Sequence, residues 1–349
     1  MINKPKTFGQ PTSTITAWRF VMVMTVVFWG LTQGYGQDPQ YSQYYNAAVY
    51  HNPAFAGTST PQRLSVNYRA QWPGLPAPYI NYSAAFDFCF QKTGTSFGLI
   101  ATQDVAGISK FRMTSAGLLI GQKVKLNKDI TASFGVQVSY DTRDIGSASL
   151  IFPDQVTKDG LIAATAEPKR AGSTSYVNTS IGGLVFGRDW WAGLSIHNFN
   201  QPSLDPLGGK AGILYPRTTL IGGLRFPLQD DRYLKPHQQG DAIMPSIMYR
   251  SQGSAAQIDL GVTAELNSFV FGLYTRGLPF LNNIRGVFTQ DAIIGMVGVR
   301  TNDIRLAYSY DYNSASYLSE FQGAHEISLQ IGFNLKRYLK YRNGPCPGM

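Results

Sequence analysis

The stretch EISLQIGFNL, Glu326 to Leu335, alternates between apolar residues and polar or small ones. Successive side chains of an extended strand point to opposite faces, so its five apolar residues all lie on one face. These residues are Ile327, Leu329, Ile331, Phe333 and Leu335. Alternation over about ten residues is the signature of a strand that crosses a membrane within a β-barrel. The stretch therefore predicts one face toward lipid and one toward a polar lumen.

The same alternation recurs along the chain and predicts an all-β protein. About fourteen strands are expected, an even number as in bacterial single-chain barrels. Three of them, 111–126, 173–187 and 288–300, alternate poorly and contain several glycines, so their expected ends are approximate. The expected spans are 62–72, 78–90, 95–104, 111–126, 130–141, 173–187, 190–199, 216–227, 243–251, 256–266, 268–276, 288–300, 303–312 and 325–335. We expect a transmembrane outer-membrane β-barrel of antiparallel strands.

The connections between the expected strands differ in length from one side to the other. The even-numbered ones are very short, whereas several odd-numbered ones are long, including 142–172, 200–215, 277–287 and 313–324. Outer-membrane barrels have short periplasmic turns and long external loops. This pattern predicts that both termini are periplasmic. The charged stretch 228–242 is an even-numbered connection that departs from the rule.

A soluble β-sandwich also alternates and is the competing fold class. Aromatic residues at strand ends, such as Trp72, Trp191 and Tyr312, are typical of the two interfaces of a membrane. The polar faces also place charges in the middle of strands, which suits a wet lumen. Both features favour the barrel.

Residues 1–36 have the pattern of a signal peptide. Basic residues precede the apolar run FVMVMTVVFWGL (Phe20–Leu31), and Gly34 and Gly36 supply small residues for cleavage. The apolar run is shorter than the roughly 20 residues that a spanning helix needs. We therefore expect export, a mature amino-terminal arm at 37–61, a barrel at 62–335 and a basic periplasmic tail at 336–349.

The composition argues against several other classes of protein. Two cysteines and four scattered histidines give neither a disulfide framework nor a metal-ligand spacing, and no cofactor is expected. The formal charge of +9 owes much to the leader and the tail, so nucleic acid is not an expected partner. Gly94–Gly98 spells G-x-S-x-G, but no helix follows it as hydrolases require. His325 and Glu326 are adjacent on a strand and point to opposite faces. We expect no enzyme activity.

Three blocks, in order along the chain, resemble one known family. DPQYSQY (Asp38–Tyr44) and NPAFAG (Asn52–Gly57) form the first block, RAQWPG (Arg69–Gly74) the second, and SYDYN with HEISL (Ser309–Leu329) the third. From about Gln37 to its end, the chain resembles the PorP/SprF family of outer-membrane proteins, associated with type IX secretion in Bacteroidota.

The resemblance implies a non-enzymatic accessory of type IX secretion that helps to export or anchor cell-surface adhesins, with a link to gliding motility in the family. Its implied partners are the C-terminal domain of a secreted adhesin, a periplasmic lipoprotein and peptidoglycan-binding proteins. The barrel itself would contact outer-membrane lipid. A porin-like passive channel for small solutes is the alternative function.

The arm Gln37–Ser59 is rich in tyrosine and has no Lys or Arg, the reverse of a disordered tail. We expect it to act as a docking or plug element, and because it contains no strand, we expect the barrel to assemble without residues 41–50. The expected partner or plug contacts are Asp38, Pro39, Tyr41, Tyr44, Asn52, Pro53, Phe55, His325 and Glu326.

Charges of both signs are expected to face the lumen. Two interpretations stay open, a mutually paired lining that makes the barrel rigid, and a polar socket for the arm or for a partner's terminus. The residues are Arg63, Arg69, Asp87, Asp141, Asp259, Glu265, Asp303, Arg305 and Asp311.

Overall fold

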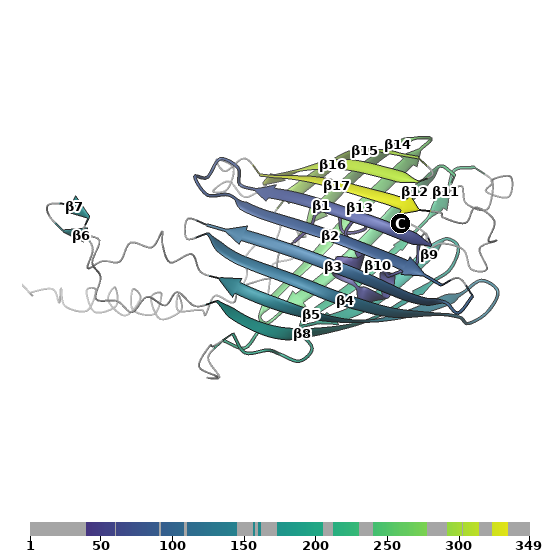
Figure 1. Cartoon of the computed structure of the whole chain (residues 1–349). Coiled ribbons are helices and arrows are strands. Elements are labelled where there is room, and N and C mark those ends of the chain that lie inside the picture. Colours follow the sequence, from purple (N-terminus) through teal and green to yellow (C-terminus); the bar gives the residue numbers. More distant parts are fainter. Residues whose placement is uncertain are drawn as a thin grey trace, which may run out of the picture. The chain divides into compact units, whose positions relative to one another are not determined.

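A closed antiparallel sheet forms the body of the protein in the computed structural model (Figure 1). The structure describes residues 40–59, 61–90, 92–107, 110–144, 156–157, 160–161, 173–204, 212–229, 240–277, 292–301, 303–313 and 323–333. The first strand, β1 (Gln62–Gln71), pairs with the last, β17 (Ala324–Phe333). Pairing of β10 (Arg217–Leu224) with β12 (Ala242–Gln252) completes the circle. Within the described residues the barrel has fourteen strands, which confirms the predicted fold class.

Each strand of the barrel pairs with its neighbours along the chain. The two-residue β11 (Phe226–Pro227) follows β10 and pairs with β12. The other strands are β2 (Tyr79–Cys89), β3 (Thr95–Ala106), β4 (Phe111–Lys125), β5 (Thr131–Asp144), β8 (Thr174–Phe186), β9 (Trp190–His197), β13 (Ala255–Leu266), β14 (Phe269–Arg276), β15 (Ala292–Arg300) and β16 (Ile304–Asn313).

Four short elements do not belong to the barrel wall. The strands β6 (Val156–Thr157) and β7 (Gly160–Leu161) pair with each other in the connection between β5 and β8. The four-residue helix α2 (Ala48–His51) and the 3-10 turn η1 (Pro53–Phe55) precede β1. In the described part of the chain, no helix has the length and apolarity needed to cross a bilayer.

The observed strands agree closely with the predicted ones. The largest differences are three residues, at the end of β5, predicted at 141 and observed at Asp144, and at the end of β10, predicted at 227 and observed at Leu224. Residues 288–291 and 334–335 of the predicted spans lie outside the described residues. The alternation signal located the strands well because its period of two residues belongs to no other regular structure.

The wall is apolar outside and largely polar inside, the reverse of a soluble protein. Large apolar side chains such as Leu118, Phe134 and Leu273 are at least 60% exposed. Charged side chains such as Arg69 and Glu326 are 1% exposed or less. An apolar outer surface of this kind fits a bilayer, where lipid takes the place of water.

Part of the inner wall is apolar, which the sequence analysis did not expect. Leu119 of β4, Leu184 of β8, and Ile294 and Met296 of β15 are buried inside the barrel. These strands are the three that alternate poorly in sequence, because both of their faces are apolar. Trp191, expected at a membrane interface, is also buried among these residues.

The two ends of the barrel differ in their connections. The end that we call the short-turn mouth has brief turns such as 187–189 and 267–268, and also the longer stretch 228–241. The opposite end, the long-loop mouth, has the stretches 145–173, 198–216, 277–291 and 314–323. Tight turns at 107–110 and 253–254 also lie at the long-loop mouth.

Phe333 allows a test of the outward face. Its side chain is 39% exposed and follows Ile327, Leu329 and Ile331 on the outer face of β17. Substitution Phe333→Asp should destabilise the folded barrel in a membrane by about 1 to 4 kcal/mol, depending on depth. The amount of heat-modifiable protein in the membrane fraction should fall, as measured by unheated gel electrophoresis. The matched variant Phe333→Leu should fold normally, and normal folding of both would contradict an outward Phe333.

Candidate functional site

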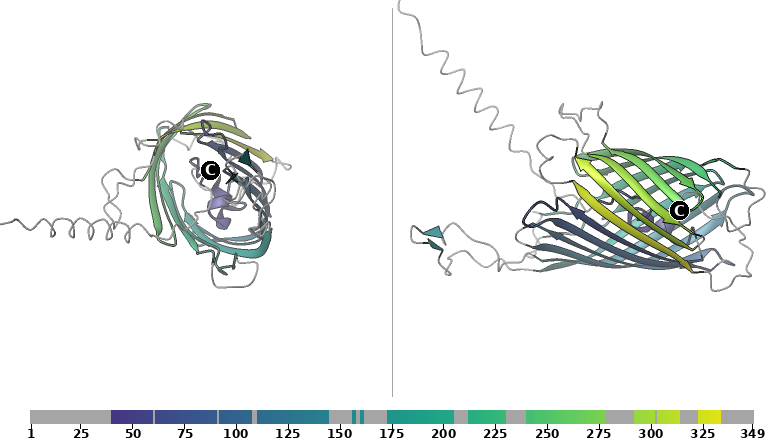
Figure 2. Two further views of the ribbon diagram at one scale, coloured as in Figure 1. Left: turned by 90° about the vertical axis from the view of Figure 1, so that its left-hand side faces the viewer. Right: turned by 90° about the horizontal axis from the view of Figure 1, so that it is seen from above.

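Residues Gln40–Ser59, which we call the lumen segment, lie inside the barrel (Figure 2). All of them except Gln40 and Tyr50 are buried. The segment contains α2 and η1, and its contacts reach strands on every side of the wall. The lumen is therefore occupied by the chain's own amino-terminal part.

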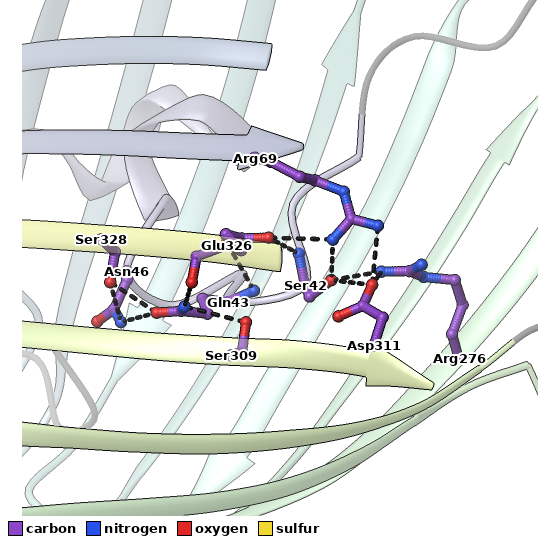
Figure 3. Close-up of polar contacts among 9 residues, drawn as sticks. All are labelled: Ser42, Gln43, Asn46, Arg69, Arg276, Ser309, Asp311, Glu326 and Ser328. Carbon is purple, nitrogen blue, oxygen red and sulfur yellow. Dashed lines mark hydrogen bonds and ion pairs between the residues drawn. The ribbon is translucent and has the colours of Figure 1, made fainter. Parts of the chain in front are cut away.

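The first anchor of the lumen segment is Ser42, which lies among four buried charged side chains (Figure 3). The backbone N–H groups of Ser42 and Gln43 donate to the two carboxylate oxygens of Glu326, at 2.7 and 3.1 Å. The Ser42 hydroxyl donates to Asp311 Oδ2 at 2.7 Å. Glu326 thus holds two consecutive backbone donors that would otherwise be unpaired in a buried site.

Two arginines balance the two carboxylates of this anchor. Arg69 forms ion pairs with Asp311 at 2.8 Å and Glu326 at 3.3 Å, and Arg276 pairs with Asp311 at 3.0 Å. Both arginines also donate to the Ser42 hydroxyl oxygen. Buried charges are tolerated when they are paired and hydrogen-bonded, and this cluster meets both conditions.

Beside this anchor, to its left in Figure 3, amide side chains bind the segment to β16 and β17. Gln43 donates to the Ser309 hydroxyl at 3.0 Å and to the Glu326 carbonyl at 3.2 Å. Asn46 donates to Gln43 Oε1 at 2.7 Å and to the Ser328 hydroxyl at 2.8 Å. This network fixes the segment in one register against the wall, since each amide has a specific partner.

Aromatic rings join the segment to the apolar part of the wall. Tyr44 and Tyr45 contact Tyr274 of β14, with ring centroids 5.8 and 5.9 Å apart. The Tyr45 hydroxyl donates to the sulfur of Met296 at 2.9 Å. The apolar inner wall thus forms a hydrophobic core with the segment, and this core explains why the wall is not polar throughout.

Glycines in the wall make room for the Asn52-Pro53 turn. Gly135 of β5 and Gly182 of β8 are cross-strand partners. A Cβ at Gly182 would overlap Asn52 Oδ1, and one at Gly135 would overlap the Pro53 carbonyl. Close approach of two backbones is a common reason for glycine within a strand. Asn52 uses this space to donate to the carbonyls of Gly183 and Leu194, at 3.1 and 3.2 Å.

The second anchor is Gly57, near the short-turn mouth. Its N–H donates to Asp87 Oδ2 at 2.6 Å, and its carbonyl accepts from Lys123 Nζ at 2.5 Å. Asp87 also pairs with Arg63 at 3.0 Å. Gly57 has a φ of +69°, and a Cβ there would lie 2.7 Å from that of Ser96. Only glycine suits this backbone and this spacing.

These contacts change the expectation that the barrel assembles without residues 41–50. Removing them would leave Glu326 without two backbone donors and would empty the hydrophobic core around Tyr274. Unpaired buried polar groups and cavities are both strongly destabilising. We now expect the barrel to depend on the lumen segment for its stability.

The predicted contact residues fall into three groups. Tyr41, Tyr44, Asn52, Pro53, Phe55 and Glu326 are all buried in the lumen. His325 lies instead on the outer face, where its ring is 5.0 Å from that of Tyr310 and its Nδ1 is 2.7 Å from the Tyr308 hydroxyl. Asp38 and Pro39 lie outside the described residues.

The predicted lumen charges are similarly divided. Arg63 and Asp87 belong to the second anchor, and Arg69 and Asp311 to the first. Glu265 and Arg305 form a separate buried cluster with Arg300. Asp141 and Asp259 are buried and accept hydrogen bonds from Asn178 and Gln257. Asp303 is exposed and precedes β16, so the prediction that it faces the lumen was wrong.

Several residues of the site were missed by the sequence analysis. Arg276 and Arg300 are the last residues of β14 and β15, where alternation no longer shows which face a side chain takes. Ser42, Gln43 and Asn46 carry no charge and gave no signal beyond their place in the tyrosine-rich arm. Of the glycine pair, Gly182 lies in a strand that was noted for weak alternation, and nothing in the sequence singled out Gly135.

A polar cavity of about 60 Å³ remains beside the lumen segment. Tyr41 and Tyr50 line one side of it, and Asp104, Asp141 and Asn178 belong to the wall around it. A volume of this size accommodates a few water molecules. In the described residues, no three His, Cys, Asp or Glu side chains are grouped as metal ligands would be.

The fold and the site define the class of the protein. A closed barrel with an apolar outer surface is a membrane-spanning β-barrel of the outer-membrane type. The family model described as "Type IX secretion system membrane protein PorP/SprF" matches residues 33–331. The chain therefore belongs to the PorP/SprF family, as the resemblance predicted.

The other comparisons found only distant similarity. No curated protein matches the chain. Among solved structures it is similar to the P. putida toluene transporter TodX, at 9% identity and a TM-score of 0.47 over 83% of this chain and 95% of that one. It is also similar to the Ralstonia pickettii toluene transporter TbuX, at 10% identity and a TM-score of 0.46 over 83% and 94%. Likenesses this distant say nothing of what this chain binds.

Substitution Glu326→Gln tests the first anchor. It keeps the shape of the side chain but removes the charge that pairs with Arg69 and accepts from two backbone N–H groups. Loss of one partner of a buried ion pair costs about 3 to 5 kcal/mol. The midpoint of urea unfolding in detergent should fall accordingly. The control Asp303→Asn, at an exposed carboxylate, should leave the midpoint unchanged, and equal behaviour of the two variants would contradict the anchor.

Substitution Gly182→Ala tests the close approach of the Asn52-Pro53 turn. The added methyl group would overlap Asn52, so the free energy of unfolding should fall by about 1 to 3 kcal/mol. Gly295 is the matched control, because it lies in a strand and a Cβ there meets nothing within 4 Å. Gly295→Ala should be neutral in the same urea titration. A neutral Gly182→Ala would show that the turn does not lie against β8.

Proposed function

We propose that this protein is a non-enzymatic outer-membrane accessory of type IX secretion that docks exported surface proteins and links them to periplasmic partners. Membership of the PorP/SprF family supports a role in type IX secretion. The observation that favours docking over passage is the filled lumen, in which the segment Gln40–Ser59 is bound at both ends. The mouths and their connections, rather than the lumen, are then the surfaces that partners contact.

The occupied lumen argues against the alternative, a porin-like channel for small solutes. Porins of 16 to 18 strands keep an aqueous path, whereas smaller barrels are often filled by side chains or a plug. Here a hydrophobic core crosses the lumen through Tyr44, Tyr274 and Ile294. The small polar cavity lies beside the lumen segment and is far smaller than a solute pathway would be.

The hydrolase-like motif has a structural explanation that involves no chemistry. Ser96 of Gly94–Gly98 is fully buried and lies against Gly57 of the lumen segment. The close approach of Gly57 leaves room for only a small side chain at this position. No role for Ser96 in catalysis is proposed.

Loss of the gene tests the docking function. A deletion strain should lose surface display of at least one protein that carries a type IX secretion signal, as measured by protease shaving of intact cells and mass spectrometry. Complementation with a variant whose long connection 145–173 is replaced by a short turn should fail to restore display if that loop contacts the cargo. Replacement of the short turn 127–129 by another tight turn is the control and should restore it. Unchanged surface display in the deletion strain would contradict the proposal.

Ion conductance separates the docking barrel from the porin. Purified protein inserted into a planar bilayer should show no stable conductance steps, because the lumen segment fills the path. Steps of the size given by open porins in the same bilayer would favour the channel. The Glu326→Gln variant provides an internal comparison, since loosening the first anchor should produce transient openings that the native protein lacks.

A further inference from the structure

The lumen segment crosses the barrel from one mouth to the other. Its first anchor joins Ser42 to Arg69, Asp311 and Glu326. Arg69 and Asp311 are two residues from the ends of β1 and β16, and Glu326 is two residues from the start of β17. These strand ends lead into the connections 72–78 and 314–323, so Ser42 lies near the long-loop mouth.

The second anchor lies near the opposite mouth. Gly57 contacts Asp87, two residues from the end of β2, and Lys123, two residues from the end of β4. Both ends lead into short turns, at 90–94 and 126–130. The chain between Ser42 and Gly57 therefore runs from the long-loop mouth to the short-turn mouth, where β1 begins.

Because the segment runs in this direction, the two ends of the described chain lie at opposite mouths of the barrel. Gln40 is at the long-loop mouth, whereas β17 ends with Phe333 at the short-turn mouth, opposite Gln62 of β1. The prediction that both termini are periplasmic assumed that the chain before β1 stays on the side where β1 begins. That assumption does not hold for a segment that passes through the lumen before β1 begins.

The predicted signal-peptide cleavage after Gly36 leaves only residues 37–39 ahead of Gln40. Three residues span at most about 10 Å when fully extended. The barrel wall crosses a hydrocarbon layer of roughly 30 Å, so such a short piece cannot return to the other mouth. The position of Gln40 thus fixes the side on which the mature chain begins.

We infer that the mature amino terminus is presented at the long-loop mouth, on the opposite side of the membrane from the end of the last strand. With the long loops outside, a single continuous chain then has its beginning at the cell surface and its basic tail in the periplasm. The end of the lumen segment at Gln40 is then the part that an exported protein at the cell surface can reach, a statement that rests on the proposed function.

This arrangement gives the docking proposal a physical link between the two sides. A surface protein that binds the amino-terminal end would contact a segment whose other end is bonded to Asp87, Lys123 and Arg63 near the periplasmic mouth. Pulling the segment outward would require both anchors to break, and the chain continues directly into β1. The segment is therefore a tether within the barrel and is not free to leave it.

Single-cysteine labelling tests the inference without reference to any partner. The background is Cys346→Ser, which leaves only Cys89, a buried residue. Asp38→Cys reports on the amino terminus, and intact-mass measurement confirms that cleavage is unaltered. Ser254→Cys and Lys128→Cys are exposed references at the long-loop and short-turn mouths. The native Cys346, in the otherwise unchanged chain, reports on the carboxy-terminal tail.

With a membrane-impermeant maleimide on intact cells, Asp38→Cys should label to the same extent as Ser254→Cys. Lys128→Cys and Cys346 should label only after the outer membrane is permeabilised. An inverted orientation would protect Asp38→Cys and Ser254→Cys together, which would contradict the proposed orientation but support the inference. Labelling of Asp38→Cys under the same conditions as Lys128→Cys would overturn the inference. Failure of Asp38→Cys to react with the maleimide in detergent would also overturn it.

Discussion

The Glu326 carboxylate binds the backbone N–H groups of Ser42 and Gln43, and the arrangement of the lumen depends on this contact. A fully buried carboxylate needs cations and donors around it, and here Arg69 and two main-chain donors supply them. In an empty barrel the ion pairs among these wall residues would remain, but Glu326 would lose its two main-chain donors. Wall and segment therefore form one folded unit, since each completes the hydrogen bonds of the other.

The filled lumen also accounts for features of the wall that a water-filled barrel would not have. Ile294, Met296 and Leu184 face inward and share one hydrophobic core with Tyr44 and Tyr45 of the segment. Gly135 and Gly182 leave the space that the Asn52-Pro53 turn occupies. The inner face of the wall is thus polar at the two anchors near the mouths and apolar in the core between them.

Much of the fold was predictable from sequence, because alternation with a period of two reports directly which residues share a face. The three weakly alternating strands were harder, since their inner faces pack against a segment whose position no local pattern reveals. The lumen charges Arg69, Asp311 and Glu326 were predicted to face inward, and they do. Their partners were not predictable, because a hydrogen bond between residues 42 and 326 depends on the whole barrel closing around the arm.

The direction of the segment could not be predicted from the sequence either. Topology rules for barrels place the ends of strands, and they are silent about a chain that passes through the lumen before the first strand begins. Asp303 was misplaced for a simpler reason. It precedes the first residue of β16, so the alternation of the strand does not place its side chain.

Hydrogen exchange measured by mass spectrometry on the purified protein in lipid nanodiscs tests the filled lumen most directly. The backbone N–H groups of Ser42, Gln43 and Gly57 are bonded to buried carboxylates. Peptides covering residues 40–59 should therefore exchange as slowly as those from β1 and β17. Exchange of these peptides within seconds, while the strands remain protected, would mean that the segment is not held in the lumen and would contradict the account.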